Sequence, residues 1–308
     1  MRVSVIITCY NQAHFLGEAI ESVIAQTYGA SEIIAVDDGS SDDPAAVAAR
    51  YPGVIFIRQD NQGVAAARNT GFRRSSGVYI VFVDGDDRLL PEALETGIQH
   101  LNARRECAFV SGRFKTITSD GSPTHTWPQP DVTGAHYLEL LREVYIQTPA
   151  TVMFRREVLQ IVNGFDTSPM FMNCGDHELY LRVARSFPVC SHSKVVAEWR
   201  EHATNTSNDA AMMLKSGLAI YDANLKYVKG DKQYEQAHRS GIRVLQAHFG
   251  KRLIFRIWKH AEVRAWKEAR HELFVLLRNC LPGMLQHSFR RINHGIVNSI
   301  KGRFAGWR

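Results

Sequence analysis

The sequence has few cysteines and no long apolar run, and these absences exclude several protein classes. Its five cysteines are odd in number and share no spacing typical of a zinc site: Cys9, Cys107, Cys174, Cys190 and Cys280. Such usage favours reduced thiols over a disulfide framework, as in a cytoplasmic protein. No run approaches about 18 uninterrupted apolar residues, so we expect no transmembrane helix. The chain enters an apolar segment at Val3 without the plan of a signal peptide, which also favours the cytoplasm.

Several well-known motifs are also missing. No G-x-G-x-x-G follows the first apolar segment, so the dinucleotide-binding fingerprint is absent, and no G-x-x-x-x-G-K-[ST] of a P-loop NTPase occurs. No serine or cysteine elbow resembles a covalent nucleophile, which disfavours hydrolases. No known nucleic-acid module is readable, so we expect no nucleic-acid partner.

Charge is distributed unevenly along the chain. Residues 210–308 contain 19 Lys or Arg and 6 Asp or Glu, a net charge of +13. The whole chain carries +6, which leaves −7 for residues 1–209. An acidic first part and a basic second part indicate two different roles. We therefore expect a domain over residues 1–208 and a basic helical region over residues 209–308.

Short apolar segments alternate with segments of helical periodicity, which predicts an α/β fold with a mostly parallel sheet flanked by helices. The expected strands span residues 3–8, 33–36, 54–57, 78–84, 109–110, 114–117, 152–154 and 194–200. The expected helices span residues 13–26, 44–50, 63–74, 89–101, 156–162 and 176–185. An irregular loop is expected over 119–134, and beyond 208 the chain is predicted to be helical with breaks near Gly230, Gly250 and Pro282.

The segment around which the chain is organised ends in a cluster of acids. A buried strand over 78–83 is followed by Asp84, Gly85, Asp86 and Asp87. The carboxyl edge of an open α/β sheet is where ligands bind, and packed carboxylates repel one another unless a cation lies among them. Oxygen ligands suit Mg²⁺ or Mn²⁺, which often also bind substrate phosphates. The pattern predicts a metal-bridged phosphate site, and the alternative is an acidic turn before a helix.

Four separated segments, taken together, resemble family 2 glycosyltransferases, which use nucleotide-diphosphate sugars on a GT-A fold. They are Val5–Asn11, Val36–Ser40, Asn61–Gly71 with its Ala-Arg-Asn-Thr-Gly end, and Asp84–Asp87. The resemblance covers about residues 1–208 and leaves residues 210–308 unexplained. It implies an inverting hexosyltransferase that moves a sugar from a nucleotide-diphosphate sugar, with a UDP-sugar as the expected donor, to an acceptor hydroxyl.

The resemblance implies a role for each matching residue at the nucleotide. Thr8 and Tyr10 match residues that line the base, and Asp38 matches the acid that hydrogen-bonds it, with Asp37 beside it. Arg68 matches the arginine near the base and the diphosphate. The alternatives are a turn and helix cap for the two acids and a helix-face ion pair for the arginine.

The acidic cluster matches the D-x-D of the family, which implies Mn²⁺ or Mg²⁺ as cofactor. Asp86 is the better candidate for the metal bond, Asp84 for the ribose or the metal, and Asp87 for a supporting position. Arg200 and His202 lie in a segment, Trp199–Ser207, that resembles the R-x-H-x-x-x-x-S closing over the diphosphate. The histidine could touch the metal or a phosphate, and its alternative is a structural hydrogen bond.

The catalytic base is expected at the start of a helix, where Asp176 matches the family position. Gly175 stands where the family usually has Glu, so the sequence departs from the pattern at one point, and Glu178 is the fallback. A base must lie within hydrogen-bond reach of the acceptor hydroxyl, and a helix N-terminus favours an ionised carboxylate. The alternative for Asp176 is a bare helix cap.

Two other functions remain open on the sequence alone. A non-catalytic nucleotide-sugar-binding or scaffold protein on the same fold is suggested by Gly175, and a nucleotidyltransferase would release pyrophosphate instead of a nucleoside diphosphate. The preferred interpretation is a transferase in surface-polysaccharide or glycolipid assembly, acting on a saccharide or a lipid-linked saccharide.

The C-terminal region mixes basic and bulky apolar residues, as in residues 251–260, 289–292 and 301–308. Cationic helices with Trp and Phe, such as Phe255, Trp258, Phe289, Phe304 and Trp307, can lie on an anionic membrane surface. We therefore expect a cytoplasmic protein that is peripheral at the inner face of the membrane. The alternative is a helical bundle with a solvated basic face.

Overall fold

The structure is a computed structural model that describes residues 2–125 and 129–287. Of the aromatic residues expected at a membrane surface, Phe289, Phe304 and Trp307 lie outside the described residues, as does Trp127 of the irregular loop. The chain divides into two compact units, residues 1–208 and residues 209–308.

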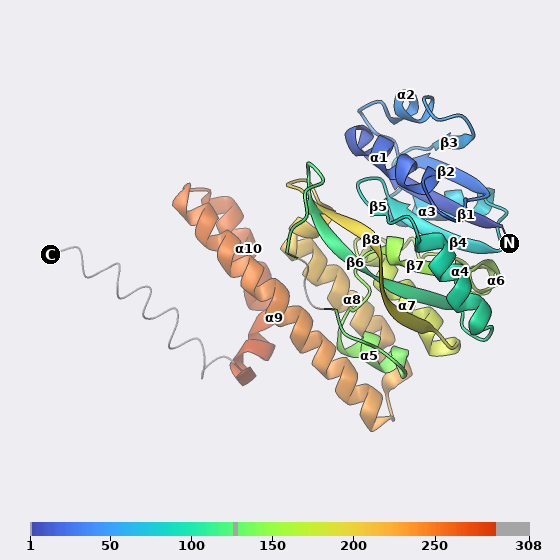
Figure 1. The fold of residues 1–308 in the computed structure, drawn as a ribbon. Coiled ribbons are helices and arrows are strands. Elements are labelled where there is room, and N and C mark those ends of the chain that lie inside the picture. The colour runs from blue at the N-terminus through green and yellow to red at the C-terminus, as the bar shows by residue number, and fades with distance from the viewer. Residues whose placement is uncertain (1, 126–128, 288–308) are drawn as a thin grey trace. The chain divides into compact units, whose positions relative to one another are not determined.

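Half of the eight-stranded sheet in the first unit is parallel and has the strand order β3-β2-β1-β4 (Figure 1). Its strands are β1 (Val3–Cys9), β2 (Glu32–Asp37), β3 (Val54–Arg58) and β4 (Tyr79–Asp84). Their side chains are largely apolar, and β1 is buried along its whole length, as expected of a strand covered on both faces. β1 lies between β2 and β4, so the acidic residues that end these two strands lie on either side of it.

Helices accompany this half as the apolar periodicity predicts. They are α1 (Ala13–Ile24), α2 (Pro44–Ala48), α3 (Val64–Arg74) and α4 (Ala93–Ala103). α3 packs closely on β1, because a Cβ at Gly71 would lie 2.3 Å from Ile6 Cγ2. The helix expected from residue 89 begins at Ala93, because Leu89 belongs to a short strand, β5 (Arg88–Leu89), and pairs with Ala197.

The other half of the sheet is mixed. β7 (Val152–Arg155), β6 (Phe109–Thr118), β8 (Cys190–Glu201) and β5 follow β4 in that order. β7 is antiparallel to both neighbours and β5 to β8, while β6 and β8 run parallel. The two strands expected at 109–110 and 114–117 form the single strand β6, whose register against β8 shifts between Ser111 and Phe114. Gly112 lies in this irregularity, where a Cβ would meet the His192 ring at 2.6 Å.

The first unit contains further helices, of which those labelled η are single 3₁₀ turns. They are η1 (Pro149–Thr151), α6 (Arg156–Ile161), η2 (Pro169–Phe171), α7 (Gly175–Ser186), η3 (Thr206–Asn208) and α5 (His136–Arg142). The sequence did not predict α5. Its N-cap, Ala135, has a left-handed backbone and makes no side-chain cap, so the usual start signal is missing.

Up to residue 287, the second unit contains three helices: α8 (Ala210–Val228), α9 (Lys232–Glu262) and α10 (Trp266–His287). The chain breaks at Gly230, whose φ of +97° suits glycine, as expected. The breaks expected at Gly250 and Pro282 were wrong, because α9 and α10 continue through them. Gly250 packs against α10 with Cys280 Sγ 3.6 Å from the position of a Cβ, and a proline removes one main-chain hydrogen bond without necessarily ending a helix.

The core of this unit is formed by residues from all three helices: Ala210, Ala211, Leu214, Phe249, Leu253, Val275, Leu276 and Cys280. Across residues 2–125 and 129–287, no helix is both long and apolar enough to cross a membrane.

Candidate active site

The candidate site lies at the carboxyl ends of β1, β2 and β4. Cys9 is paired with Asp37, and Thr8 is paired with Asp84, so two acidic turns flank the end of β1. We call residues 37–40 the first acidic turn and residues 84–87 the second acidic turn.

Asp37 is fully buried in the first acidic turn, and its carboxylate pairs with an arginine of the neighbouring strand. Its Oδ2 lies 2.9 Å from Arg58 Nη1 on β3, and its Oδ1 accepts a hydrogen bond of 2.9 Å from the Ser40 amide. The pairing of Asp37 with Arg58 also follows from the parallel register of β2 and β3. Asp37 therefore ties the turn to the neighbouring strand.

Asp38 accepts three hydrogen bonds from the loop that leads into α3. Its Oδ1 receives the Gln59 side chain at 2.7 Å and the Gln62 amide at 3.0 Å, and its Oδ2 receives the Gly63 amide at 2.8 Å. Gly63 has a φ of +87°, which glycine adopts without strain. This carboxylate is nearly buried and fixes the shape of the loop.

Thr8 and Tyr10 follow the end of β1 but differ in exposure. Thr8 is buried, and its Oγ1 lies 3.4 Å from Asp84 Oδ1. Tyr10 is 49% exposed, which leaves its ring accessible to a planar ligand.

Arg68 joins the second acidic turn to the expected base. It is buried on α3, donates from Nη2 to Asp84 Oδ1 at 2.7 Å, and contacts Asp176 Oδ1 through Nη1. Burial raises the pKa of Asp84, with Asp176 and Asp86 raising it further, while the Arg68 charge opposes this rise. A single guanidinium therefore holds two carboxylates from segments 92 residues apart in sequence.

A loop after α6 fixes the position of Arg68. The Asn69 amide donates to the Phe165 carbonyl at 2.9 Å and accepts from the Phe165 amide at 2.9 Å. The Arg68 guanidinium lies over the Phe165 ring, 5.2 Å from its centre. Gly164 has a φ of +65°, and a Cβ there would meet Asn69 Oδ1 at 2.4 Å. No role was predicted from the sequence for Asn69 or Phe165, although Asn69 lies within one of the four segments that resemble the family.

Asp86 is buried in the second acidic turn and contacts two polar side chains. Its Oδ2 lies 2.8 Å from His202 Nε2 and accepts a hydrogen bond of 2.7 Å from the Gln12 amide. His202 Nδ1 lies 2.9 Å from Thr204 Oγ1, which orients the ring. The structure thus brings Asp86 and His202 together, as the hypothesis of a shared ligand requires.

These two groups suit a divalent ion that also binds a substrate phosphate. In octahedral Mg²⁺ sites, adjacent ligand atoms about 2.1 Å from the ion lie about 3 Å apart, close to the 2.8 Å between Asp86 Oδ2 and His202 Nε2. Within residues 2–125 and 129–287, no group of three or more His, Cys, Asp or Glu side chains could hold a metal. An ion held here would have one carboxylate and one imidazole from the described residues as ligands, and its other ligands would come from substrate and water.

Asp87 is buried, and its hydrogen bonds indicate a structural role. Its Oδ2 accepts from Thr148 Oγ1 at 2.8 Å, and its Oδ1 accepts from the Arg200 amide at 3.0 Å. Burial raises the pKa of Asp87 well above its usual value, and the neighbouring charges of Asp86 and Asp84 raise it further.

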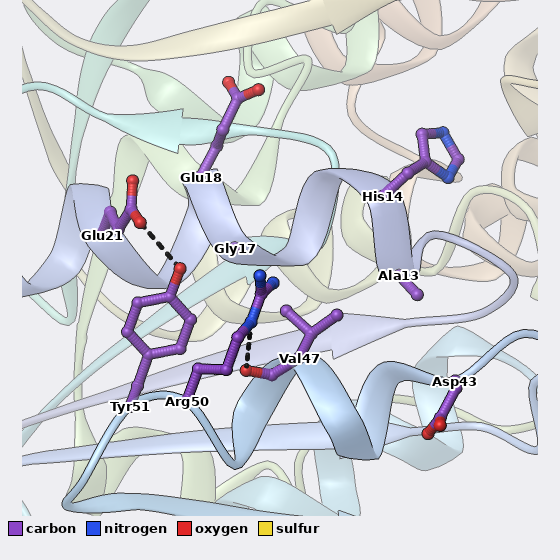
Figure 2. A pocket seen from close by; sticks show the side chains of 9 residues that line it. All are labelled: Ala13, His14, Gly17, Glu18, Glu21, Asp43, Val47, Arg50 and Tyr51. Carbon is purple, nitrogen blue, oxygen red and sulfur yellow. Dashed lines mark hydrogen bonds between the residues drawn. The ribbon is translucent and has the colours of Figure 1, made fainter.

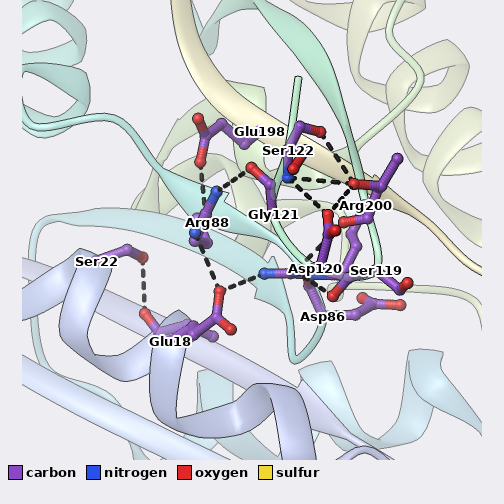
Figure 3. Close-up of polar contacts among 12 residues, drawn as sticks. Glu18, Ser22, Asp86, Arg88, Ser119, Asp120, Gly121, Ser122, Glu198 and Arg200 are labelled. Atoms are coloured by element: carbon purple, nitrogen blue, oxygen red, sulfur yellow. Dashed lines mark hydrogen bonds and ion pairs between the residues drawn. The ribbon is translucent and has the colours of Figure 1, made fainter. Parts of the chain in front are cut away.

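Arg200 is fully buried and supports the second acidic turn from behind (Figure 3). Its Nε donates to the Asp86 carbonyl at 2.8 Å, and its Nη1 donates to the Ser119 carbonyl at 2.9 Å. Its Nη2 lies 2.6 Å from Glu18 Oε2 on α1. The guanidinium also lies over the Phe15 ring, 4.7 Å from its centre. Arg200 therefore positions the main chain at Asp86, and its guanidinium nitrogens bond to groups of the protein itself.

Glu18 extends this network across the sheet. The same Oε2 that contacts Arg200 lies 3.0 Å from Arg88 Nη1, and Arg88 Nε lies 2.6 Å from Glu198 Oε2 (Figure 3). Lys115 completes the chain of charges at 2.9 Å from Glu198 Oε1. Glu18 was not predicted from the sequence, because it is one of several polar residues on the helix and no local pattern distinguishes it.

Asp176 lies in the first turn of α7, and its side chain is partly exposed. A Cβ built at Gly175 would have Ala65 Cβ at 3.9 Å as its nearest neighbour, so the position has room for a side chain. Glu178 is engaged elsewhere, because its two oxygens lie 2.9 and 2.7 Å from Arg182 Nε and Nη2. The structure therefore joins Asp176, and not Glu178, to the acidic cluster.

A groove of about 490 Å³ lies outside this site, between α1 and α2 (Figure 2). Among the residues lining it, the Tyr51 hydroxyl donates to Glu21 at 2.7 Å and Arg50 bonds the Val47 carbonyl at 3.5 Å. Glu18 lines the groove and belongs to the network behind the second acidic turn. Asp84, Asp86 and Asp176 do not line it, so the groove is separate from the second acidic turn and from the proposed base.

Comparison with known proteins bears on the first unit above all. A model of the family described as glycosyl transferase family 2 matches residues 4–162. Chondroitin synthase of Escherichia coli is 29% identical over 215 residues, which cover 67% of this chain and 30% of that protein. The chain thus spans less than a third of that relative's length.

Solved structures share the fold. TarS 1-349 of S. aureus in complex with UDP has a TM-score of 0.61 at 19% identity, covering 81% of this chain and 72% of that one. A mannosyltransferase of Pyrobaculum calidifontis in complex with GDP-Man and Mn²⁺ has a TM-score of 0.62 at 17% identity, covering 91% and 87%. At these identities the likeness shows an α/β fold of the GT-A kind.

Proposed function

The chain belongs to glycosyl transferase family 2 and is a glycosyltransferase, and on this premise we propose that it transfers a sugar with inversion from a UDP-sugar to an acceptor hydroxyl. The contact of Arg68 with both Asp84 and Asp176 carries the proposal. It keeps a carboxylate of the donor side and the proposed base on one guanidinium. An acceptor hydroxyl at Asp176 would then lie close to a sugar held at the second acidic turn.

The proposed donor site uses both acidic turns. The nucleotide base would stack on the exposed ring of Tyr10, with Thr8 beside it, and would meet the main chain around Asp37 and Asp38. Two observations support a nucleoside diphosphate: a fold neighbour is a complex with UDP, and another is a complex with GDP-Man. Uracil is our choice between the two bases.

Asp86 and His202 are the proposed ligands of Mn²⁺ or Mg²⁺. A divalent ion bound there would neutralise the charge that develops on the leaving diphosphate. Gln12 orients the carboxylate by its hydrogen bond, and Arg200 fixes the main chain behind it. Asp84 would contact the ribose or the ion, and Asp87 would hold the turn.

Asp176 is the proposed general base. Its Oδ1 contacts Arg68, which leaves Oδ2 to accept the proton of the acceptor hydroxyl. Asp176 lies in the first turn of α7, where a helix N-terminus attracts negatively charged groups. The acceptor oxygen would attack the anomeric carbon from the face opposite the diphosphate, and the carbon–diphosphate bond would break with inversion.

The acceptor class and the location of the enzyme follow from the basic second unit. We propose a saccharide or lipid-linked saccharide in surface-polysaccharide or glycolipid assembly, presented at the cytoplasmic face of a membrane. A relative over the matched region is a chondroitin synthase, an enzyme named for a polysaccharide product.

A screen of nucleotide sugars for metal-dependent release of nucleoside diphosphate tests the proposal. We expect release with a UDP-sugar and Mn²⁺, loss of release on chelation, and failure of Asp176→Asn to release UDP although it binds the donor. Release of pyrophosphate would instead indicate a nucleotidyltransferase.

A non-catalytic nucleotide-sugar-binding protein is the second candidate, because Gly175 lacks the carboxylate that the family usually has there. It predicts that UDP with Mn²⁺ raises the melting temperature while no donor is consumed with any acceptor. Installing the missing acid by Gly175→Glu, which the space at this position allows, would then restore no turnover.

A further inference from the structure

The α9–α10 hairpin exposes an unusual number of large apolar side chains for a surface. Seven lie between residues 255 and 277: Phe255, Trp258, Val263, Trp266, Leu273, Phe274 and Leu277. Large exposed apolar patches mark sites of contact with proteins or membranes. These seven side chains, which we call the hairpin patch, are the starting point.

The apolar residues of both helices lie on two sides. On α9, Phe249 and Leu253 are buried in the core, while Phe255 and Trp258 are exposed with ring centres 6.3 Å apart. On α10, Val275 is buried. The exposed positions 266, 273 and 277 of α10 are spaced by seven and four residues, which places them along one stripe. A helix that is apolar beyond its core-facing side has a second apolar environment to enter.

Basic residues accompany this patch. Residues 251–280 contain eight Lys or Arg and three Glu, a net charge of +5. One of the three acids, Glu272, is buried and lies 2.5 Å from Arg256 Nε, so it offers little negative charge to the surface. Lys259 Nζ lies 4.8 Å from the centre of the Phe255 ring. A cation therefore lies directly beside the exposed ring of Phe255.

This charge selects among possible occupants. A second copy of the hairpin would bring +5 against +5. The chain after residue 287 contains five Lys or Arg and no Asp or Glu, so it does not complement the patch either. An anionic lipid surface complements both the charge and the apolar side chains, since Trp and Phe lie in the interface while Lys and Arg contact the headgroups.

We propose that the hairpin patch, together with its flanking Lys and Arg, is the surface by which the protein docks on an anionic membrane. This deepens the proposed function and rests on it in one respect, because a lipid-linked acceptor gives the docking its purpose. The patch lies within the described residues.

The second unit offers a matched control on α8. Phe255 and Trp258 are 53% and 47% exposed, and Leu225 and Tyr227 are 50% and 46% exposed. Lys226 Nζ lies 4.8 Å from the Tyr227 ring, the distance between Lys259 and Phe255. The variants F255S/W258S and L225S/Y227S therefore remove similar exposed apolar groups beside a lysine.

The test is co-sedimentation of the full chain, without nucleotide, with vesicles of phosphatidylcholine alone or mixed with phosphatidylglycerol. We expect binding to the anionic vesicles alone, weakened but not abolished by high salt, because apolar insertion is not screened. F255S/W258S should weaken binding by about ten- to a hundredfold, and L225S/Y227S by less than about threefold.

Equal binding by the two double variants would overturn the proposal, and so would wild-type protein that ignores both vesicle types. Circular dichroism and UDP binding establish that each variant is folded. As a second measurement, brominated lipid should quench the fluorescence of Trp258 and Trp266, and unchanged fluorescence would also overturn the proposal. Since no donor is used, failure here leaves the sugar-transfer proposal intact, and an inactive enzyme that still binds vesicles leaves the docking surface intact.

Discussion

The two acidic turns are alike in sequence and different in surroundings. Both follow a buried strand of the parallel half of the sheet, and both place adjacent acids beside the end of β1. In the first, Asp37 and Asp38 are held by residues 40–63, from the same part of the chain. In the second, Asp84 contacts Arg68, 16 residues away, whereas Asp86 contacts His202, 116 residues away.

The difference shows how one motif can serve two purposes. Donors that converge on Asp38 satisfy its charge without a cation, so the hydrogen bonds of this turn favour no metal there. In the second turn, burial and then the neighbouring carboxylates raise the pKa of Asp87, and burial raises the pKa of Asp84 against the opposing charge of Arg68. A cation near such a cluster would favour the ionised carboxylates.

Asp176→Asn should produce the largest loss, because it removes the proposed base attached through Arg68 to the second turn. A positioned base is typically worth about 10²–10⁴-fold, so kcat should fall by that factor while UDP-sugar binding by calorimetry stays near wild type. Glu178→Gln is the control, since Glu178 pairs with Arg182 on the same helix. An Asp176→Asn enzyme with an unchanged kcat would contradict the assignment, and a fall confined to Glu178→Gln would move the role of base to Glu178.

Asp86→Asn should weaken Mn²⁺ binding in the presence of UDP by about ten- to a hundredfold or more, because a charged ligand is lost. Asn has nearly the same size and shape as Asp, so the melting temperature without metal should be unchanged or higher. Calorimetric titration of Mn²⁺ measures the effect. Undiminished metal-dependent binding would contradict the assignment of this turn to a cation.

Asp38→Asn should act on stability and not on the metal. The amide nitrogen of Asn would face an N–H donor of the loop at residues 59–63, which leaves a buried donor unpaired at a cost of about 1–3 kcal/mol. For a unit of this size that corresponds to a fall in melting temperature of about 2–4 °C per kcal/mol. Thermal denaturation with and without Mn²⁺ checks it; a changed Mn²⁺ affinity with unchanged stability would remove the contrast between the turns.

Glu18→Gln should have the smallest effect, since it alters a residue that acts on Asp86 through Arg200. Losing its charge should weaken Mn²⁺ binding by about tenfold or less. Glu198→Gln is the matched control, because Glu198 contacts Arg88 and Lys115 and not Arg200. If both variants lower the melting temperature equally and neither changes Mn²⁺ affinity, Glu18 serves stability alone.

Much of the first unit could be predicted because its signals are local. The strands before Asp37 and Asp84 are short apolar runs, and α1 and α3 show helical spacing, so each could be located from a window of the sequence. The family resemblance named Arg68, Asp86 and His202, which the structure brings into one cluster. Their roles in the reaction stay predictions.

The remainder depends on pairing between distant segments. Glu18 and Arg200 are 182 residues apart, and no local pattern relates them. Leu89 reads as the start of a helix until Ala197 pairs with it. Gly250 was predicted to break the helix because glycine has a low helix propensity. Its contact with Cys280 on α10, which explains a glycine there, arises only when α9 and α10 pack. In each case tertiary contacts override a local preference.

The dependence of the second acidic turn on Arg200 has a consequence for the order in which the protein matures during synthesis. β1 to β4 are complete by residue 84, whereas the main chain at Asp86 and the carboxylate of Asp87 are held by a residue made 113 or 114 positions later. Contacts of such long sequence separation form late, because the intervening loop must first be closed. A nascent chain that has not yet released β8 from the ribosome would therefore have its parallel half-sheet but an unshaped acidic turn. The proposed cation site at Asp86 would therefore take shape only after the last strand of the first unit has docked.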